Sequence, residues 1–197
     1  MTETRRIIGV TGPIACGKSR VMAALADQGA ILIDADLVYR DLIKPGLPLT
    51  RALADRFGEG ILNEAGEIDR KALGGIVFSD PAALADLDRL THPAIVAEIE
   101  RRIAALDAPL IAIEAVKLSQ GGVGRICDET WLILCDRPRQ IERLMSRNHL
   151  TRADSERRIA AQTTYDPARY TRVIENNGDL AELDRAVMAA LAAVTEG

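Results

Sequence analysis

Short apolar runs alternate along the chain with longer stretches in which apolar residues recur at helical spacing. The runs predict five buried strands, which are Ile7 to Thr11, Ala30 to Ile33, Leu110 to Ile113, Trp131 to Cys135, and Arg172 to Ile174. Within each run the apolar residues follow one another without alternation, as in strands covered on both faces. Helical stretches supply the connections, so the pattern predicts a three-layer α/β fold with a five-stranded parallel sheet.

The interval from residue 41 to residue 107 is too long for a simple connection between two parallel strands. Ser79-Asp80-Pro81 predicts a helix start, and His92-Pro93 predicts that a further helix begins there. Asn63 to Gly66 predicts a turn. The last stretch of the chain, Leu180 to Val194, predicts an amphipathic helix. We therefore expect residues 41–107 to form a mostly helical insertion.

A glycine-rich segment, Gly12 to Ser19, stands between the first predicted strand and a helical stretch. Its spacing, G-x-x-x-x-G-K-S, predicts the phosphate-binding loop of a P-loop NTPase fold. The glycines let backbone N–H groups turn inward around phosphates, Lys18 reaches the β- and γ-phosphates, and the Ser19 hydroxyl ligates Mg²⁺. The alternative is a chance glycine turn, but the strand and the helix on either side favour the phosphate loop.

Polar side chains follow the other four predicted strands, as Asp34 and Asp36, Glu114, Asp136, and Glu175 to Gly178. Ligands of open α/β sheets bind beyond the carboxyl ends of the strands, so we expect these segments to converge. If strand geometry continues through Asp34, then Asp34 and Asp36 share a face. One carboxylate then accepts a hydroxyl proton while the other orients Mg²⁺-bound water or an arginine. The alternative is that these acids cap helices or lie in solvated turns.

Arginines are concentrated in residues 137–158, directly after the fourth strand. Arg139, Arg143 and Arg147 recur at every fourth position and share one helical face. We interpret this segment as a lid that brings guanidinium groups to the transferring phosphoryl group. A solvated helix paired with acidic residues is the alternative. Thr151 predicts the N-cap of a second lid helix that runs through Gln162.

The composition excludes several other classes of protein. A formal net charge of −4 argues against a general nucleic-acid binder. No apolar run approaches the length of a secretory signal or a membrane span, so we expect a cytoplasmic protein. Cys16, Cys127 and Cys135 fit reduced thiols. Cys16 lies at a helix N-terminus beside Lys18, and we hypothesise a lowered pKa with modest reactivity.

Eight segments, in order, resemble the dephospho-CoA kinase family. They are Val10-Thr11-Gly12, Cys16-Gly17-Lys18-Ser19, Ile33-Asp34-Ala35-Asp36, Pro45-Gly46, Ile68-Asp69-Arg70-Lys71-Ala72-Leu73, Leu90-Thr91-His92-Pro93, Arg158-Ile159-Ala160-Ala161-Gln162 and Val173-Ile174-Glu175-Asn176-Asn177-Gly178. Only the phosphate loop is specific by itself, but the set covers nearly the whole chain. The resemblance implies ATP-dependent phosphorylation of the ribose 3′-hydroxyl of dephospho-CoA, with ATP as co-substrate and Mg²⁺ as cofactor.

The resemblance also implies that one domain, residues 1–197, contains three parts with different functions. The core comprises residues 1–40, 108–136 and 165–197, the helical acceptor-binding part residues 41–107, and the lid residues 137–164. The expected partner is the small-molecule acceptor, without nucleic acid or membrane, and the chain is expected to be a monomer or a weak homo-oligomer.

Roles for individual residues follow from the same resemblance. Asp36 matches the aspartate that activates the 3′-hydroxyl, and Lys18, Arg143 and Arg147 complete the expected catalytic set. The expected nucleotide-binding residues are Gly12, Ala15, Cys16, Gly17, Lys18, Ser19, Arg20, Asn177 and Gly178, and Ser19 is also the expected Mg²⁺ ligand. The expected acceptor-binding residues are Asp34, Arg70, His92 and Lys117, of which Lys117 stands where the family commonly has an apolar stretch and is not implied by the resemblance. For Lys117, contact with an acceptor phosphate and a surface position remain equal alternatives.

The phosphate loop departs from the family pattern G-G-I-G-S-G-K-S. Pro13 and Ala15 replace two glycines, and Cys16 replaces a serine. Pro13 removes one N–H from the loop, and both replacements restrict the backbone. Two other functions remain as alternatives, a different nucleoside or small-metabolite P-loop kinase and a nucleotide-binding switch. The second alternative is weak, because a GTPase needs an N-K-x-D motif and no Asn-Lys pair occurs.

Overall fold

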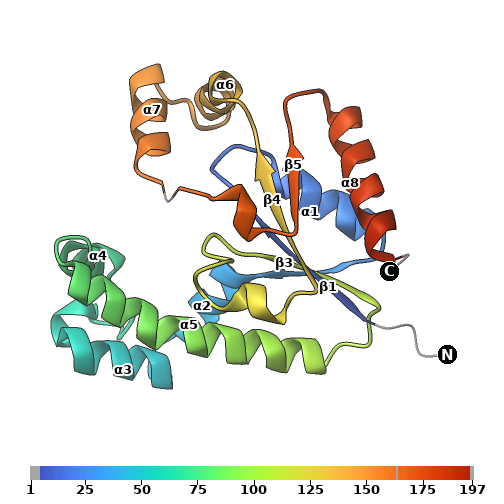
Figure 1. Cartoon of the computed structure of the whole chain (residues 1–197). Coiled ribbons are helices and arrows are strands. Elements are labelled where there is room, and N and C mark those ends of the chain that lie inside the picture. The colour runs from blue at the N-terminus through green and yellow to red at the C-terminus, as the bar shows by residue number, and fades with distance from the viewer. Residues whose placement is uncertain (1–4, 163, 196–197) are drawn as a thin grey trace. The chain divides into compact units, whose positions relative to one another are not determined.

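The computed structural model describes residues 5–162 and 164–195. The chain folds into two compact units, the first from residues 1–33 and 108–197 and the second from residues 34–107 (Figure 1). The second unit contains the predicted helical insertion and begins a few residues before it, at the end of the second strand. The predicted lid, residues 137–164, belongs to the first unit.

The first unit is built on a five-stranded sheet, as the apolar runs predict. Its strands are β1 (Arg6–Thr11), β2 (Ile31–Asp34), β3 (Leu110–Glu114), β4 (Glu129–Leu134) and β5 (Arg172–Glu175), in the order β2-β3-β1-β4-β5. The pairs β1–β3, β1–β4 and β4–β5 are parallel, and Val10 is paired with Trp131 across the centre. The strand order reverses beside β1, where an open α/β sheet forms its ligand crevice.

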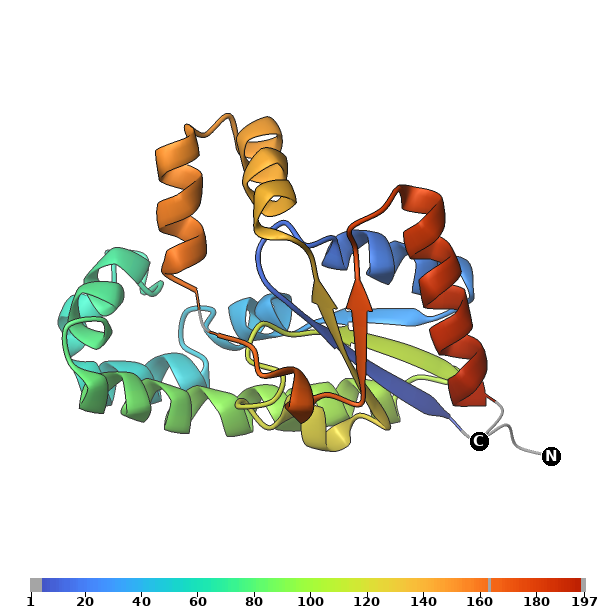
Figure 2. The same cartoon turned by 45° about the horizontal axis from the view of Figure 1, so that its top comes forward.

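Four helices accompany this sheet: α1 (Lys18–Asp27), α6 (Arg137–Asn148), α7 (Arg152–Ala160) and α8 (Leu180–Thr195). Helices α1 and α8 pack against each other and bury a core that includes Leu25, Trp131 and Val187. Helices α6 and α7 lie side by side after β4 (Figure 1, Figure 2). Thr151 caps α7 as predicted, because its hydroxyl accepts a hydrogen bond from the Asp154 N–H.

The second unit consists of α2 (Ala35–Leu42), α3 (Pro48–Phe57), α4 (Arg70–Val77) and α5 (Pro81–Ala104). Helix α5 packs against the other three, and their apolar side chains form a separate core around the fully buried Leu53. Two 3₁₀ turns, Val123–Ile126 and Pro167–Arg169, belong to the first unit, and a third, Glu59–Ile61, belongs to the second.

The prediction that a helix begins at His92-Pro93 is wrong, because α5 runs through Pro93 without interruption. A proline inside a helix removes one backbone hydrogen bond and costs about 3 kcal/mol. Helix α5 tolerates this cost because its packing against α2, α3 and α4 stabilises it on both sides of Pro93. Its start at Pro81, with the Asp80 carboxylate accepting from the Ala82 N–H, agrees with the sequence.

Within the described residues, none of the helices combines the length and apolarity that crossing a membrane requires.

Candidate functional site

Two glycines of the phosphate loop occupy positions that exclude any larger residue. Gly12 has φ of 149°, and a Cβ there would lie 2.2 Å from the backbone oxygen of Ile133 in β4. Gly17 has φ of 98°, and a Cβ there would lie 2.2 Å from the Asn176 side-chain nitrogen. Such contacts exclude a side chain at either position. Glycine is therefore required at position 12 by the backbone of β4, and at position 17 by its positive φ together with the Asn176 side chain.

Amide side chains from distant segments hold the loop between these glycines. Gln140 in α6 donates to the Ile14 carbonyl at 2.8 Å, and Gln162 after α7 accepts from the Ile14 N–H at 2.9 Å. Asn176 after β5 donates to the Cys16 carbonyl at 2.9 Å. Each bond satisfies a loop backbone group that no helix or strand satisfies. The predicted lid thus contacts the phosphate loop directly through Gln140 and Gln162.

Ala15, one of the two residues that replace family glycines, has a strained backbone that neighbouring residues support. Ala15 has φ of 60°, in the left-handed region where an L-residue costs about 1–2 kcal/mol. A hydrogen bond from Arg143 offsets part of this cost, since its Nη1 lies 3.5 Å from the Ala15 carbonyl oxygen. The Pro13 carbonyl accepts from the Cys16 N–H at 3.4 Å and from Lys18 Nζ at 3.3 Å. The loop therefore keeps a defined turn despite the two replacements.

A cavity of about 710 Å³ opens over the loop and gathers several predicted residues. Its lining consists of Ile14, Ala15, Gly17, Lys18, Ser19, Glu114, Glu142, Arg143, Ser146 and Arg147. Lys18 Nζ lies 2.9 Å from the Gly12 carbonyl oxygen and 4.0 Å from Glu114 Oε1. The volume suits a nucleotide-sized ligand. Three cationic side chains around one cavity favour a ligand with several negative charges.

The hypothesis of a lowered pKa at Cys16 is wrong. The Cys16 side chain is buried, and its Sγ lies 2.7 Å from the Cys135 Sγ. The hydrogen bond with Cys135 and the burial both raise the pKa of Cys16, and the opposing effect of Lys18 is the smallest contribution. The local sequence around Cys16 shows only the helix N-terminus and Lys18, whereas the second thiol, Cys135, follows β4 and comes next to Cys16 only in the fold.

Three predicted nucleotide residues make contacts elsewhere in the first unit. Arg20 forms a two-pronged ion pair with Asp184 of α8. Asn177 accepts from the Asp136 N–H at 2.7 Å and donates to the Asp136 carboxylate at 3.2 Å. Gly178 has no room for a side chain, because a Cβ would clash with Glu182. Asn177 and Gly178 therefore shape the link between β5 and α8.

Lys117 lies in a turn after β3, and its carbonyl accepts from the N–H groups of Gln120 and Gly121. The two sequence alternatives for its side chain both stay open.

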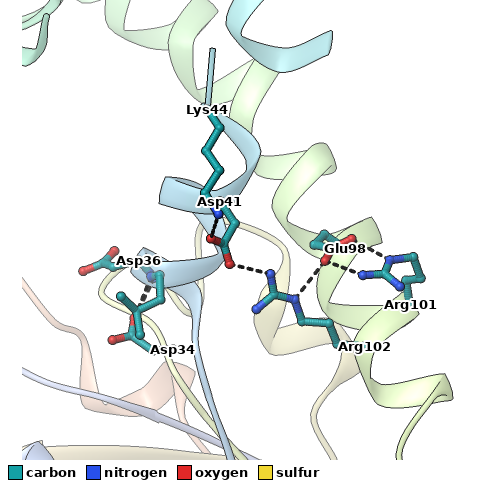
Figure 3. Close-up of polar contacts among 8 residues, drawn as sticks. Asp34, Asp36, Asp41, Lys44, Glu98, Arg101 and Arg102 are labelled. Carbon is teal, nitrogen blue, oxygen red and sulfur yellow. Dashed lines mark hydrogen bonds and ion pairs between the residues drawn. The ribbon is translucent and has the colours of Figure 1, made fainter. Parts of the chain in front are cut away.

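Asp34, the last residue of β2, and Asp36 have different local roles within the second unit. Asp34 is the N-cap of α2, and its carboxylate accepts from the N–H groups of Asp36 and Leu37 at 2.8 and 3.2 Å. Asp36 lies in the first turn of α2, so strand alternation does not relate the two side chains. Figure 3 shows the Asp36 carboxylate pointing away from the ion pair that Asp41 forms with Arg102. Asp36 is therefore presented on a different face of α2 from that ion pair.

Two other predicted acceptor residues also lie in the second unit. Arg70 begins α4 directly after the N-cap Asp69, and its charge opposes the burial that raises the pKa of Tyr39. His92 Nε2 lies 3.3 Å from Asp88 Oδ1, one turn earlier on α5. The structure thus places Asp34, Asp36, Arg70 and His92 in the same unit.

Sequence reasoning missed Gln140, Glu142 and Ser146 and assigned no role to Asn176. Gln140 and Asn176 hold the loop, and Glu142 and Ser146 line the cavity one turn apart on α6. Helical spacing was a usable signal, since Ser146 follows Glu142 by four positions next to Arg143 and Arg147. For Asn176, the local signal is an amide side chain soon after a predicted strand, and its burial is seen only in the structure.

Comparison with known proteins agrees with this site. A family model described as dephospho-CoA kinase matches residues 6–182. A dephospho-CoA kinase from Geobacter sulfurreducens is 43% identical over 186 residues, covering 92% of this chain and 94% of that protein. A solved structure from Thermus thermophilus superposes with a TM-score of 0.80 at 32% identity, covering 97% of this chain and 98% of that one.

A more distant structure, shikimate kinase from Acinetobacter baumannii in complex with shikimate, has a TM-score of 0.56 at 16% identity. The coverage is 98% of this chain and 96% of that chain, and the likeness supports the P-loop kinase fold alone. The family model extends from β1 into α8 and so includes the phosphate loop, the helical unit and the lid segment. With nearly the whole sequence matched in this way, the chain belongs to the dephospho-CoA kinase family.

Proposed function

We propose that this protein transfers the γ-phosphoryl group of ATP to the ribose 3′-hydroxyl of dephospho-CoA, giving coenzyme A and ADP. Family membership supports the choice of acceptor. The main structural support for phosphoryl transfer is that Lys18, Arg143 and Arg147 line one cavity above the phosphate loop. Phosphoryl transfer depends mainly on positioning and on neutralising charge, and these side chains supply both.

The loop and the lid arginines bind the phosphates of ATP in this proposal. Backbone N–H groups from Gly12 to Ser19 surround the β-phosphate, and Lys18 moves from the Gly12 carbonyl to the phosphate oxygens. Arg143 contacts the Ala15 carbonyl and Asn176, so it is held at the rim of the cavity. Arg147 lies one turn further along α6 and is exposed. The two arginines stabilise negative charge on the transferring group.

The residues present also fit Mg²⁺. Ser19 is the second residue of α1, is exposed, and lines the cavity together with Glu114. Mg²⁺ is commonly held by one or two protein oxygens together with substrate phosphates. We assign the direct contact to Ser19. When bound, Mg²⁺ neutralises charge on the phosphate oxygens.

Asp36 accepts the proton of the acceptor hydroxyl in this proposal. It occupies the first turn of α2, and its carboxylate is directed away from the charged groups that surround Asp41 (Figure 3). Asp34 acts through Asp36, because its carboxylate holds the Asp36 N–H and so orients the first turn. Arg70 and His92 are assigned to acceptor binding in the same unit.

We further propose that the activity takes place in the cytoplasm, where ATP is available, and that the protein acts as a monomer or a weak homo-oligomer.

The test is an assay of ADP release over a panel of acceptors that includes dephospho-CoA, AMP and shikimate. We expect turnover with dephospho-CoA to exceed turnover with the other two by at least about 10³-fold, because buried polar contacts reject acceptors that lack their partners. Preferred turnover of AMP or shikimate would replace the acceptor assignment while leaving the loop assignment intact.

Asp36→Asn tests the proton acceptor. We expect turnover to fall by roughly 10²-fold or more with ATP affinity nearly unchanged, since general-base assistance contributes at that level. Asp41→Asn is the matched control on the same helix, because Asp41 pairs with Lys44 and Arg102 instead. In contrast to both, Lys18→Ala should lose turnover and phosphate binding together. Equal activity of the Asp36 and Asp41 variants would reject Asp36 as the base.

A further inference from the structure

Two thiols are in contact at the phosphate loop, although they are 119 residues apart in the sequence. Cys16 lies inside the loop and Cys135 directly follows β4, and their Sγ atoms are 2.7 Å apart. A disulfide bond is about 2.05 Å long, so the two sulfurs need to approach by less than about 1 Å to form one. The third cysteine, Cys127, contacts the Val123 carbonyl through its Sγ.

We propose that Cys135 is a site of thiol modification, that Cys16 resolves the modified form into a Cys16–Cys135 disulfide, and that this bond weakens ATP binding. The oxidant is a low-molecular-weight disulfide, R–S–S–R. The inference about ATP rests on the function proposed above, but the modification itself does not.

The surroundings of the two sulfurs assign them different parts in the reaction. Cys135 is partly exposed, whereas Cys16 is 1% exposed. The hydrogen bond from Cys16 and the charge of Arg143 lower the pKa of Cys135, against the effects of burial and of Asp136. The pKa of Cys16 is raised, which favours Cys16 over Cys135 as the donor between the two sulfurs, and Cys135 Sγ also lies 3.9 Å from the Ala15 carbonyl oxygen. Cys135 is therefore the sulfur that attacks an external disulfide.

The reaction then proceeds in two exchange steps. The Cys135 thiolate attacks one sulfur of R–S–S–R, forming Cys135–S–S–R and releasing one RS⁻. Cys16 loses its proton and attacks the Cys135 sulfur of this mixed disulfide, which releases the second RS⁻. The two RS⁻ groups take up the two cysteine protons as RSH. Two protein thiols are oxidised by two electrons, and the oxidant is reduced to two thiols.

Arg143 links this chemistry to the nucleotide. Its guanidinium lines the phosphate cavity and also acts on the charge of Cys135. Bound phosphates compete for that positive charge and so disfavour the reactive thiolate. The disulfide in turn ties the middle of the loop to the end of β4, next to Gly17 and Lys18. By linkage each event opposes the other, and we expect a factor of about 10 in each direction.

The experiment treats the full chain with oxidised glutathione and maps linked peptides by mass spectrometry. We expect a peptide pair that joins Cys16 to Cys135, slower formation when ATP is present, and an ATP affinity about 10-fold weaker that dithiothreitol restores. Cys127→Ser is the matched control and should behave like the wild type. Cys135→Ser should form no linkage and should keep its ATP affinity after the treatment.

Cys16→Ser tests the order of events, because it removes only the resolving sulfur. We expect this variant to accumulate one glutathione on Cys135. Linked peptides that involve only Cys127, or no modification of Cys135 in any variant, would overturn the proposal. A Cys16–Cys135 bond with unchanged ATP affinity would overturn the link to ATP. All of these readouts are made without an acceptor, so they are independent of whether dephospho-CoA is the substrate.

Discussion

The phosphate loop and the helical unit use their polar side chains differently. In the loop, Gln140, Gln162 and Asn176 bind backbone atoms, and each bond fixes one point of the chain. In the helical unit, charged side chains bind one another at the surface, as where Arg102 bridges Asp41 and Glu98 (Figure 3). Surface ion pairs contribute about 0–1 kcal/mol each, so the helical unit depends on its apolar core. The loop depends on backbone geometry instead.

The largest effect is expected from Gly12→Ala. The new Cβ would meet the Ile133 backbone oxygen, which cannot rotate away, so we expect the free energy of unfolding to fall by about 3–5 kcal/mol. Gly29→Ala is the matched control, since Gly29 has φ of 84° and no described atom lies within 4 Å of the added Cβ. It should lose only about 1 kcal/mol. Urea unfolding followed by the fluorescence of Trp131, which is buried in the first unit, measures both variants.

In the helical unit, the corresponding test is Leu53→Ala. Leu53 is fully buried in the apolar core of that unit, and its truncation should cost about 2–5 kcal/mol. Leu47→Ala, at a side chain that is 38% exposed, should cost less than about 1 kcal/mol. Hydrogen exchange of the α3 and α5 amides measures the loss. ATP affinity should stay unchanged in both variants. A large loss of ATP affinity in Leu53→Ala would show that the apolar core of the helical unit also stabilises the phosphate loop.

Asn176→Ala probes the amide contacts of the loop and should have an intermediate effect. It leaves the Cys16 carbonyl without its donor and Arg143 without the Asn176 side-chain oxygen. We expect a loss of about 2 kcal/mol in the free energy of unfolding, with an ATP affinity roughly 10-fold weaker. Asn177→Ala, next in the chain but partly exposed, should cost about 1 kcal/mol. Similar losses in stability for both variants would contradict a special role of Asn176.

The smallest effect is expected from Glu98→Gln, and it depends on pH. Hydrogen bonds from Arg101 and Arg102 lower the pKa of Glu98 to about 2 in the folded protein. Because this pKa lies below the unfolded value, ionised Glu98 stabilises the folded wild type relative to the variant. This difference in the free energy of unfolding is complete above the unfolded pKa of Glu and disappears as the pH falls through about 2. Urea unfolding of both proteins at pH 7 and at pH 2 measures it. A difference that persists undiminished at pH 2 would show that Glu98 acts by packing.

Much of this molecule was predictable because its signals are local. The apolar runs place all five strands within about two residues, and the G-x-x-x-x-G-K-S spacing identifies the loop without any tertiary information. Helical spacing grouped Arg139, Arg143 and Arg147, and the last two line the cavity whereas Arg139 does not. A pattern of this kind works because strand, loop and helix each need their residues at fixed short separations.

The tertiary structure alone decided the contacts that join distant segments. No spacing rule relates Cys16 to Cys135 or Ile14 to Gln162, since packing of the sheet and of the α6–α7 pair brings them together. The same holds for α5, where packing on three helices overrides the break that Pro93 predicts locally. The sequence by itself therefore determined the kind of site and its family. The structure decided which side chains hold the loop and which of the two neighbouring thiols is buried, because burial and neighbouring charges depend on the complete fold.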